Sequence, residues 1–256
     1  MDLGLSGKSV LITGGSRGIG LAVAQTFAAE GCEIHISGRS KDDLKSAAAK
    51  IGGAVQFHVG DLRIADDLTN LAVACADVDI LINNAGATPT GRIDEVSVKD
   101  WREGLELKVV ATVALTQEIY AQMCKRRRGV IVNVIGNCGE RPDPDIIIAT
   151  VTNTGMMGFT KALGSVSPEH GVRVVGVNPG ATATDRLIYI MRDKALDRTG
   201  DAENWRELLK PLPFGRASKP EEQAAMITFA ASDRCAYVSG TILTVDAGIA
   251  NRGHIF

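Results

Sequence analysis

The octapeptide Thr13-Gly14-Gly15-Ser16-Arg17-Gly18-Ile19-Gly20 has the composition of an anion-binding turn. It follows a short apolar run at 9–12 and precedes a helical pattern over 21–30. Glycines permit a tight turn, and their backbone N–H groups can approach a phosphate at the positive end of the helix dipole. The spacing differs from G-x-G-x-x-G, so the order strand, glycines, helix is what indicates a dinucleotide site. The predicted contacts are Gly14, Ser16, Arg17, Gly18, Ile19 and Gly20.

A residue about 20 positions beyond the glycines selects between the two nicotinamide dinucleotides. A carboxylate there binds the ribose 2′-hydroxyl of NAD, whereas an arginine suits the 2′-phosphate of NADP. The second apolar run ends in Ser37-Gly38-Arg39-Ser40, and no acidic residue competes for the place. Arg39, together with Arg17 in the turn, therefore predicts NADP in preference to NAD. The alternative is that both arginines are solvent-exposed and bind nothing.

Seven short apolar runs alternate with helical patterns along the chain. The runs are 9–12, 33–36, 55–59, 80–82, 130–134, 172–177 and 242–245, and one helix is expected over 100–124. This alternation implies parallel strands joined by right-handed crossovers, hence an α/β fold with a doubly wound parallel sheet of about seven strands flanked by helices. No linker divides the chain, so a single domain is predicted over 1–256. The long interruption at 184–216 is predicted to be a substrate loop, with a plain surface excursion equally open.

The composition indicates an ordinary globular protein. The 256 residues carry a formal net charge of -2, which gives no electrostatic reason to expect nucleic acid or an anionic membrane as partner. The basic run 125–128 is interpreted as a helix end, and no apolar run is long enough to form a membrane span. Five cysteines form no CxxC pair, which favours reduced thiols and a cytoplasmic location. The four histidines show no metal-ligand spacing, so no metal site is predicted.

Further segments resemble the short-chain dehydrogenase/reductase family over essentially the whole chain. They are the octapeptide 13–20, Asp61-Leu62, Asn83-Asn84-Ala85-Gly86, Asn178-Pro179-Gly180 with Thr184, Arg216 with Pro220-Glu221-Glu222, Val238-Ser239-Gly240 and Val245-Asp246-Ala247-Gly248. The resemblance implies a Rossmann-type fold, an oxidoreductase acting on a carbonyl or alcohol, and a homodimer or homotetramer. It also implies cofactor contacts at Asp61, Leu62, Asn83, Ala85, Gly86, Pro179, Gly180 and Thr184.

The resemblance also implies where a catalytic tetrad would lie. In this family a tyrosine donates the proton, a lysine four residues later lowers its pKa, a serine orients the carbonyl and an asparagine holds a relay water. The segments 158–163 and Thr116-Gln117 fix the register, so that Ala149 replaces the tyrosine, Asn153 the lysine, Gly136 the serine and Lys108 the asparagine. A shifted register does not restore the motif, because no tyrosine lies between Tyr120 and Tyr189.

Lys108 is the first candidate for a substitute proton donor. It could hold an ammonium near the nicotinamide ribose, with Asn153 hydrogen-bonding that ribose. The alternative is that Lys108 lies on an exposed helix face, because lysine is seldom buried.

The segment 137–145 supplies the next candidates, because in the family this loop borders the substrate. Asn137 and Cys138 are left open, and Glu140 is a further possible hydrogen-bonding group. Asp143 and Asp145 are interpreted as turn residues. Tyr189, in the loop 184–216, is a weaker candidate proton donor.

Three functions remain compatible with these residues. The first is an NADP-dependent oxidoreductase with a non-standard proton donor, because general acid catalysis contributes only about 10²–10⁴-fold. The second is a nucleotide-binding regulatory or partner subunit without turnover. The third is a non-redox enzyme that reuses the pocket. The substrate is not identified by the sequence.

Overall fold

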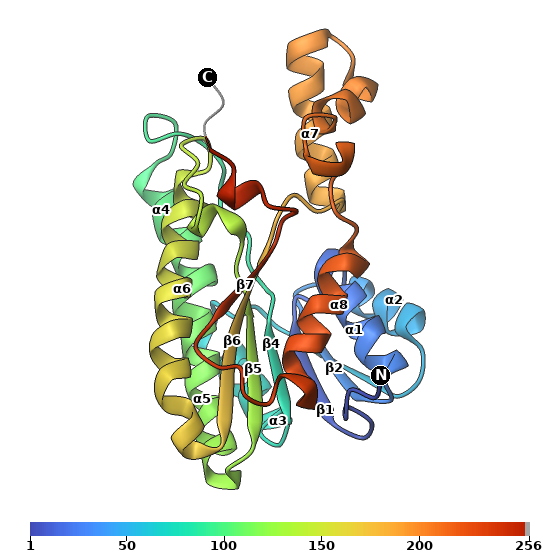
Figure 1. Cartoon of the computed structure of the whole chain (residues 1–256), viewed down its shortest axis with the longest axis vertical. Coiled ribbons are helices and arrows are strands. Elements are labelled where there is room, and N and C mark those ends of the chain that lie inside the picture. Colours follow the sequence, from blue (N-terminus) through green and yellow to red (C-terminus); the bar gives the residue numbers. More distant parts are fainter. Residues whose placement is uncertain (254–256) are drawn as a thin grey trace.

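The computed structural model describes residues 1–253 and shows a seven-stranded parallel sheet between two layers of helices (Figure 1). The strand order is β3-β2-β1-β4-β5-β6-β7, and every pairing is parallel. The strands are β1 (Ser9–Thr13), β2 (Glu33–Gly38), β3 (Val55–Val59), β4 (Ile80–Asn83), β5 (Gly129–Val134), β6 (Val172–Pro179) and β7 (Ile242–Val245). The predicted fold class is confirmed.

Eight α-helices accompany the strands in the described part of the chain. They are α1 (Gly18–Ala29), α2 (Lys41–Ile51), α3 (Ala65–Ala74), α4 (Val98–Leu105), α5 (Thr112–Arg126), α6 (Ile147–Val166), α7 (Asp185–Thr199) and α8 (Pro220–Ala231). Alternate residues of β1 face opposite layers, because Val10 and Ile12 pack in the core with α1 and α8, while Leu11 packs with α3 and α5. Burial on both faces explains why the strands read as continuous apolar runs.

The helix expected over 100–124 is interrupted in the structure. A π-helical segment, Glu106–Ala111, separates α4 from α5, and Lys108 lies within it. The extra residue in a π turn changes the direction in which the following side chains leave the helix, and such segments are frequent at functional sites. Further along, α5 ends at Arg126, as the basic run predicts, and Arg127 takes the left-handed conformation that stops it.

The segment after β6 forms an arm beyond the carboxyl ends of the strands (Figure 1). It contains α7 and a 3₁₀ segment, Ala202–Leu209, which pack on each other around Ala195, Trp205 and Leu209. This small core is separate from the cores of the sheet. The segment 184–216, predicted to be a loop, therefore forms a compact helical insertion. It lies where doubly wound sheets bind ligands.

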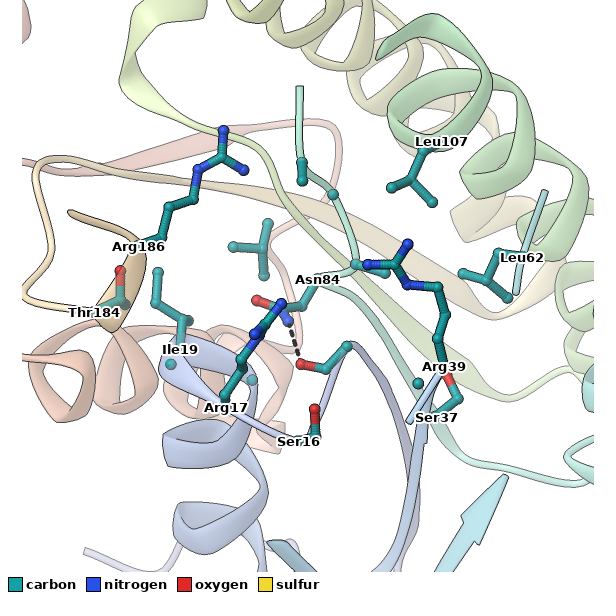
Figure 2. A pocket seen from close by; sticks show the side chains of 18 of the residues that line it. Ser16, Arg17, Ile19, Ser37, Arg39, Leu62, Asn84, Leu107, Thr184 and Arg186 are labelled. Atoms are coloured by element: carbon teal, nitrogen blue, oxygen red, sulfur yellow. Dashed lines mark hydrogen bonds between the residues drawn. The ribbon is translucent and has the colours of Figure 1, made fainter. Parts of the chain in front are cut away.

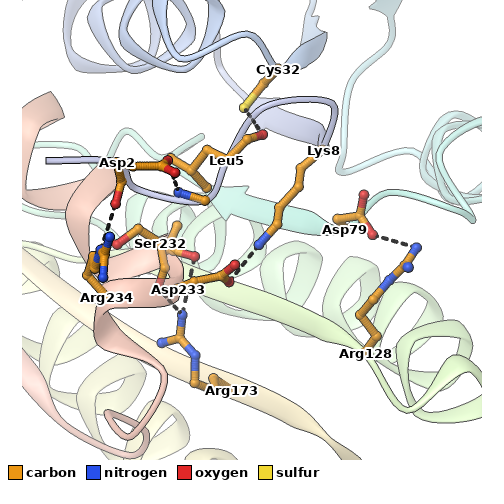
Figure 3. Close-up of polar contacts among 12 residues, drawn as sticks. Asp2, Leu5, Lys8, Cys32, Asp79, Arg128, Arg173, Ser232, Asp233 and Arg234 are labelled. Atoms are coloured by element: carbon orange, nitrogen blue, oxygen red, sulfur yellow. Dashed lines mark hydrogen bonds and ion pairs between the residues drawn. The ribbon is translucent and has the colours of Figure 1, made fainter.

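Polar contacts close the opposite end of the sheet, where the strands begin (Figure 3). Arg173, at the start of β6, donates to the carbonyl oxygens of Ala230, Ala231 and Ser232 and so caps the end of α8. Lys8 pairs with Asp233 at 2.6 Å. These contacts fasten the start of β6 and the N-terminal segment to the end of α8, away from the ligand-binding edge. Within residues 1–253, no helix combines the length and hydropathy needed to cross a bilayer.

Candidate functional site

A cavity of about 900 Å³ opens along the carboxyl ends of the strands. Its size falls in the range of ligand pockets. It is lined by most of the predicted cofactor contacts: Gly14, Ser16, Arg17, Gly18, Ile19, Gly20, Arg39, Asp61, Leu62, Ala85, Gly86, Pro179 and Thr184. Gly180 lines a second cavity of about 320 Å³ that adjoins the first and shares Ile19, Gly86, Lys108 and Thr184 with it.

The glycine turn packs tightly against the start of α1, which requires residues without side chains. A Cβ on Gly20 would lie 2.3 Å from the Gly14 carbonyl oxygen, and Gly14 and Gly18 adopt φ of 65° and 56°. The first turn of α1 has no capping side chain and no acidic residue, unlike α2, where Ser40 accepts from the Asp43 N–H. Since the N–H groups at the start of α1 lack a side-chain acceptor, this end suits a pyrophosphate.

Two arginines extend into the cavity, and neither side chain has a hydrogen-bonding or ion-pair partner within residues 1–253. Figure 2 shows Arg17 beside the glycine turn and Arg39 on the opposite side of the cavity from Arg186. Among the described residues, no side-chain hydrogen bond or ion pair engages Arg17 or Arg39, in contrast to Arg173 at the other end of the sheet. Five basic and three acidic residues line the cavity, so its balance favours an anionic ligand.

Asp61 lines the cavity but is already paired. Both oxygens of its carboxylate accept from the Arg63 guanidinium, and this hydrogen bonding holds the pKa of Asp61 below its usual range. Asp61 is therefore anionic and fixed in orientation, while its neighbour Leu62 contributes an apolar surface.

Asn83 does not line either cavity in the described structure. It is buried, and its Nδ2 donates to Thr116 and to Asn133, which ties β4 to β5 and α5. Asn84 takes the place beside the ligand, and its Nδ2 donates to the carbonyl oxygens of Thr13 and Gly14. The expected contact at Asn83 is therefore a structural hydrogen-bonding residue, and the adjacent amide supports the glycine turn.

Lys108 projects inward from the π-helical segment and does not lie on an exposed helix face. Its Nζ donates to the carbonyl oxygens of Val134 at 2.9 Å and Ile135 at 3.0 Å, and it lines both cavities. A Cβ on Gly86 would lie 2.8 Å from the Lys108 Cδ, so the stem rests directly on this glycine. Burial lowers the pKa of Lys108 from 10.5 to about 8, with a smaller lowering from the Arg186 charge.

The other three positions assigned to the tetrad lie around Lys108. Ala149 and Asn153 line the second cavity with it, and Gly136 follows Ile135, whose carbonyl accepts from Lys108. Asn153 is 5% exposed, its Nδ2 donates to the Cys138 sulfur at 2.9 Å, and its Oδ1 is buried without a partner. A Cβ on Gly136 would lie 2.6 Å from the Asn153 Nδ2, so the two residues fit together.

The remaining candidates are engaged elsewhere or stand at the margin. Asn137 lines neither cavity, and its amide donates to Asp246 at 3.2 Å. Glu140 accepts from Thr244, and Asp143 accepts from the Asp145 N–H, which confirms the turn interpretation. Tyr189 borders the large cavity but is 73% exposed.

Arg186 is a site residue that the sequence patterns did not reveal. It is the second residue of α7 and lines both cavities, and its guanidinium donates to the Thr88 carbonyl oxygen at 2.8 Å. Burial lowers its pKa, and Arg17 lowers it further. A possible signal was its position two residues after Thr184, at the start of the arm, but nothing in the sequence gives its direction.

The topology, the glycine turn and the cavity define a dinucleotide-binding α/β protein. The family model described as "short chain dehydrogenase" matches residues 8–195. The chain belongs to this family of oxidoreductases.

Relatives agree with this over nearly the full length. Gluconate 5-dehydrogenase of Gluconobacter oxydans is 33% identical over 253 residues, covering 96% of this chain and 95% of the relative. The 3-oxoacyl-[acyl-carrier-protein] reductase of Chlamydia muridarum is 30% identical over 255 residues, covering 96% and 98%. The structure of L-sorbose reductase from Gluconobacter frateurii, complexed with NADPH and L-sorbose, aligns with a TM-score of 0.92 at 31% identity, covering 98% of this chain and 100% of the other. Both the family and the glycine turn are therefore consistent with a nicotinamide cofactor.

Proposed function

We propose that the protein is an NADP-dependent oxidoreductase for a small polar carbonyl or alcohol, in which Lys108 replaces the usual tyrosine as proton donor. The observation that carries this proposal is the position of the Lys108 ammonium, where the two cavities meet and with a pKa of about 8. A general acid works best when its pKa is near the operating pH. The positions of Ala149, Asn153 and Gly136 around Lys108 support the interpretation that the ordinary tetrad is absent.

The cofactor preference rests on Arg39 and Arg17. The glycine turn and the start of α1 would hold the pyrophosphate, Leu62 would contact the adenine, and the unpaired Arg39 would bind a 2′-phosphate. When bound there, NADPH would supply a hydride to the substrate carbon. Charge-assisted hydrogen bonds from arginine to phosphate are about twice as strong as neutral ones, which favours NADP over NAD.

Lys108 has one N–H left for the substrate. An ammonium carries three donors, and two are used by Val134 and Ile135. The two carbonyl groups fix the nitrogen in position, so the third N–H can donate to the substrate oxygen. As the carbon is reduced, that oxygen takes the proton and Lys108 becomes a neutral amine, which water then reprotonates. Arg186 adds a second positive charge that favours an electron-rich oxygen.

The second cavity supports a small substrate. It measures about 320 Å³, and the charged side chains among its described lining residues are Lys108 and Arg186. Its lining also includes apolar side chains such as those of Ile190 and Leu187. Hydroxylated or carboxylated compounds would suit this lining, and two of the relatives are named for gluconate and L-sorbose. A cytoplasmic location is part of the same proposal, since the five cysteines are free. A homo-oligomer is also part of it, because the family resemblance implies one.

One observation favours a second function, nucleotide binding without turnover. Ala149 has no hydroxyl, and Tyr189 is the single phenol lining either cavity in the described part of the chain, where it is largely exposed. The nucleotide half of the site could then act as a regulatory or partner module. A non-redox reaction in the same cavity has no observation of its own.

Two measurements test the proposal. Fluorescence titration should give tighter binding of NADPH than of NADH. Turnover should then be measured with L-sorbose and a 3-oxoacyl thioester in the presence of NADPH, and with gluconate in the presence of NADP⁺. Failure to bind either nucleotide contradicts both functions, whereas tight NADPH binding without turnover on a broader panel of ketones, aldehydes and quinones favours the second.

A further inference from the structure

Three metal-ligating side chains meet outside the nucleotide site. His35 lies on β2, His58 on β3 and Cys75 at the end of α3. In the β2–β3 register, His35 pairs with Gln56, so His58 is its diagonal neighbour on the same face. The face is covered by α3, which brings the Cys75 sulfur over both rings. Neither cavity is lined by any of the three.

The three donor atoms form a triangle of the size that a metal ion requires. His35 Nδ1 and His58 Nε2 are 3.1 Å apart, and the Cys75 Sγ lies 3.7 Å from the first and 3.6 Å from the second. A tetrahedral zinc ion, with Zn–N of about 2.0–2.1 Å and Zn–S of about 2.3 Å, holds two nitrogens ~3.4 Å apart and a nitrogen and sulfur ~3.6 Å apart. All three edges therefore match within a few tenths of an ångström.

Burial prepares the two imidazoles as ligands. His35 is 8% exposed and Cys75 is 1% exposed, while His58 is half-buried. Burial lowers the pKa of both histidines, which keeps them neutral near pH 7, the form that binds metals. Burial also raises the pKa of the Cys75 thiol to about 12, so without a metal the sulfur is protonated.

The metal-free arrangement is a hydrogen-bonded pair. The ring planes are within 7° of parallel with centroids 5.4 Å apart, and so wide a separation with so short an N–N contact requires the rings to lie edge to edge. One ring then donates N–H to the other. To bind an ion, that proton moves to the other nitrogen of its own ring, each ring turns its lone pair to the metal, and the thiol loses its proton.

We propose that His35, His58 and Cys75 bind one Zn²⁺ ion, with water as the fourth ligand on the half-exposed side of His58. Two imidazoles and one thiolate with an open position are a donor set that zinc uses in proteins. The ion would join β2, β3 and α3. His35 and His58 each lie two residues before a residue that lines the nucleotide cavity, Ser37 and Gly60 respectively. The alternative is that the cluster is a satisfied polar contact in the core.

Zinc titration of the chelator-treated protein, followed by competition with a chromophoric chelator, tests the proposal. The wild-type chain should bind one equivalent, and Cys75→Ser and His58→Gln should each weaken binding at least ~10-fold, the scale of a lost ligand or supporting contact. Matched controls are Cys124→Ser and His170→Gln, which change the same residue types elsewhere. Binding should weaken about tenfold per unit fall in pH, because one thiol proton is released.

Cobalt substitution of the wild-type chain gives a readout that needs no variant. A Co²⁺ ion held by Cys75 should produce a thiolate-to-metal charge-transfer band and the visible spectrum of a four-coordinate site. Zinc should also raise the melting temperature of the wild-type protein and not that of Cys75→Ser. No stoichiometric zinc, no thiolate band, or equal losses in Cys75→Ser and Cys124→Ser would overturn the proposal.

Discussion

The glycine-turn end and the Lys108 end of the same cavity differ in how closely they keep family features. At the first, Gly14, Gly20 and the bare start of α1 form an ordinary cradle for a pyrophosphate. At the second, the positions that the resemblance assigns to a tyrosine, a lysine and a serine hold Ala149, Asn153 and Gly136, and Lys108 lines the second cavity together with Ala149 and Asn153. We therefore expect nucleotide binding and proton transfer to be separable, so that substitutions at one end should remove one property and leave the other.

The largest expected effect is on the Lys108 end. Lys108→Met keeps the stem over Gly86 but removes the proton, so turnover should fall ~10²–10⁴-fold with NADPH affinity preserved. Reduction needs the ammonium, whose pKa is about 8, so the wild-type rate should fall as pH rises through that value and oxidation should show the opposite trend. Steady-state kinetics over about pH 6–10, roughly two pH units on either side of this pKa, measures the rates of reduction and of oxidation.

Two further variants sharpen this first prediction. Lys108→Arg keeps a charge that cannot dissociate, so the limb near pH 8 should vanish together with most activity. Lys161→Met, in which an exposed lysine of α6 is changed, should behave as the wild type. Equal turnover in Lys108→Met and Lys161→Met would remove Lys108 from the chemistry.

The next effect is on the glycine-turn end. In Gly20→Ala the new methyl group would lie 2.3 Å from the Gly14 carbonyl oxygen, so the turn must open. Overpacking of this kind costs up to ~3 kcal/mol, and nucleotide affinity should therefore fall by about 10²-fold. Fluorescence titration checks it. Gly155→Ala is the matched control, since its Cβ meets nothing within 4 Å. Unchanged NADPH affinity in Gly20→Ala would separate the turn from the nucleotide.

A smaller effect tests the cofactor preference. Arg39→Ser should weaken NADPH binding by roughly 10–100-fold, because a hydrogen bond to a charged group contributes about 1.5–3 kcal/mol, and should leave NADH binding unchanged. Arg128→Ser, which changes a 70% exposed guanidinium at the other end of the sheet, is the control. Equal losses for NADPH and NADH would contradict a 2′-phosphate contact.

The smallest effect concerns the fit of Gly136 against Asn153. Gly136→Ala should lower the free energy of unfolding by about 1–3 kcal/mol, because φ is 142° and the methyl group meets the Asn153 amide at 2.6 Å. In an Asn153→Ala background the clash disappears and the cost should shrink, giving a measurable coupling in a double-mutant cycle. Denaturant unfolding of the four proteins provides the values, and strict additivity would argue against direct contact.

The sequence predicted most where the relevant residues are contiguous. The strand, the glycine turn and α1 follow one another, so their joint site could be inferred from order alone, and Arg39 follows a strand end whose place in such a sheet is known. The direction of Lys108 could not be inferred in this way, because it depends on a π-helical segment within what the pattern presented as one helix.

Other features depend on how separate elements pack. Adjacent asparagines have opposite roles, with Asn83 turned into the sheet and Asn84 toward the cavity, and residue type does not distinguish them. The contact between His35 and His58 depends on the β2–β3 register, and the approach of Cys75 to both depends on how α3 packs on the sheet. Arg186 depends on how the arm leaves β6. No local pattern contains such information.

The close fit of Gly136 and Asn153 also constrains the order in which this chain could change over generations. A residue with a β-carbon at position 136 should cost stability as long as position 153 keeps its amide, because the new Cβ would lie 2.6 Å from the Asn153 Nδ2. A lineage in which Asn153 arose first and Gly136 followed would lose stability if it reversed the glycine before the asparagine. We therefore expect the two sites to be epistatic, and efforts to introduce a hydroxyl at position 136 should begin with position 153.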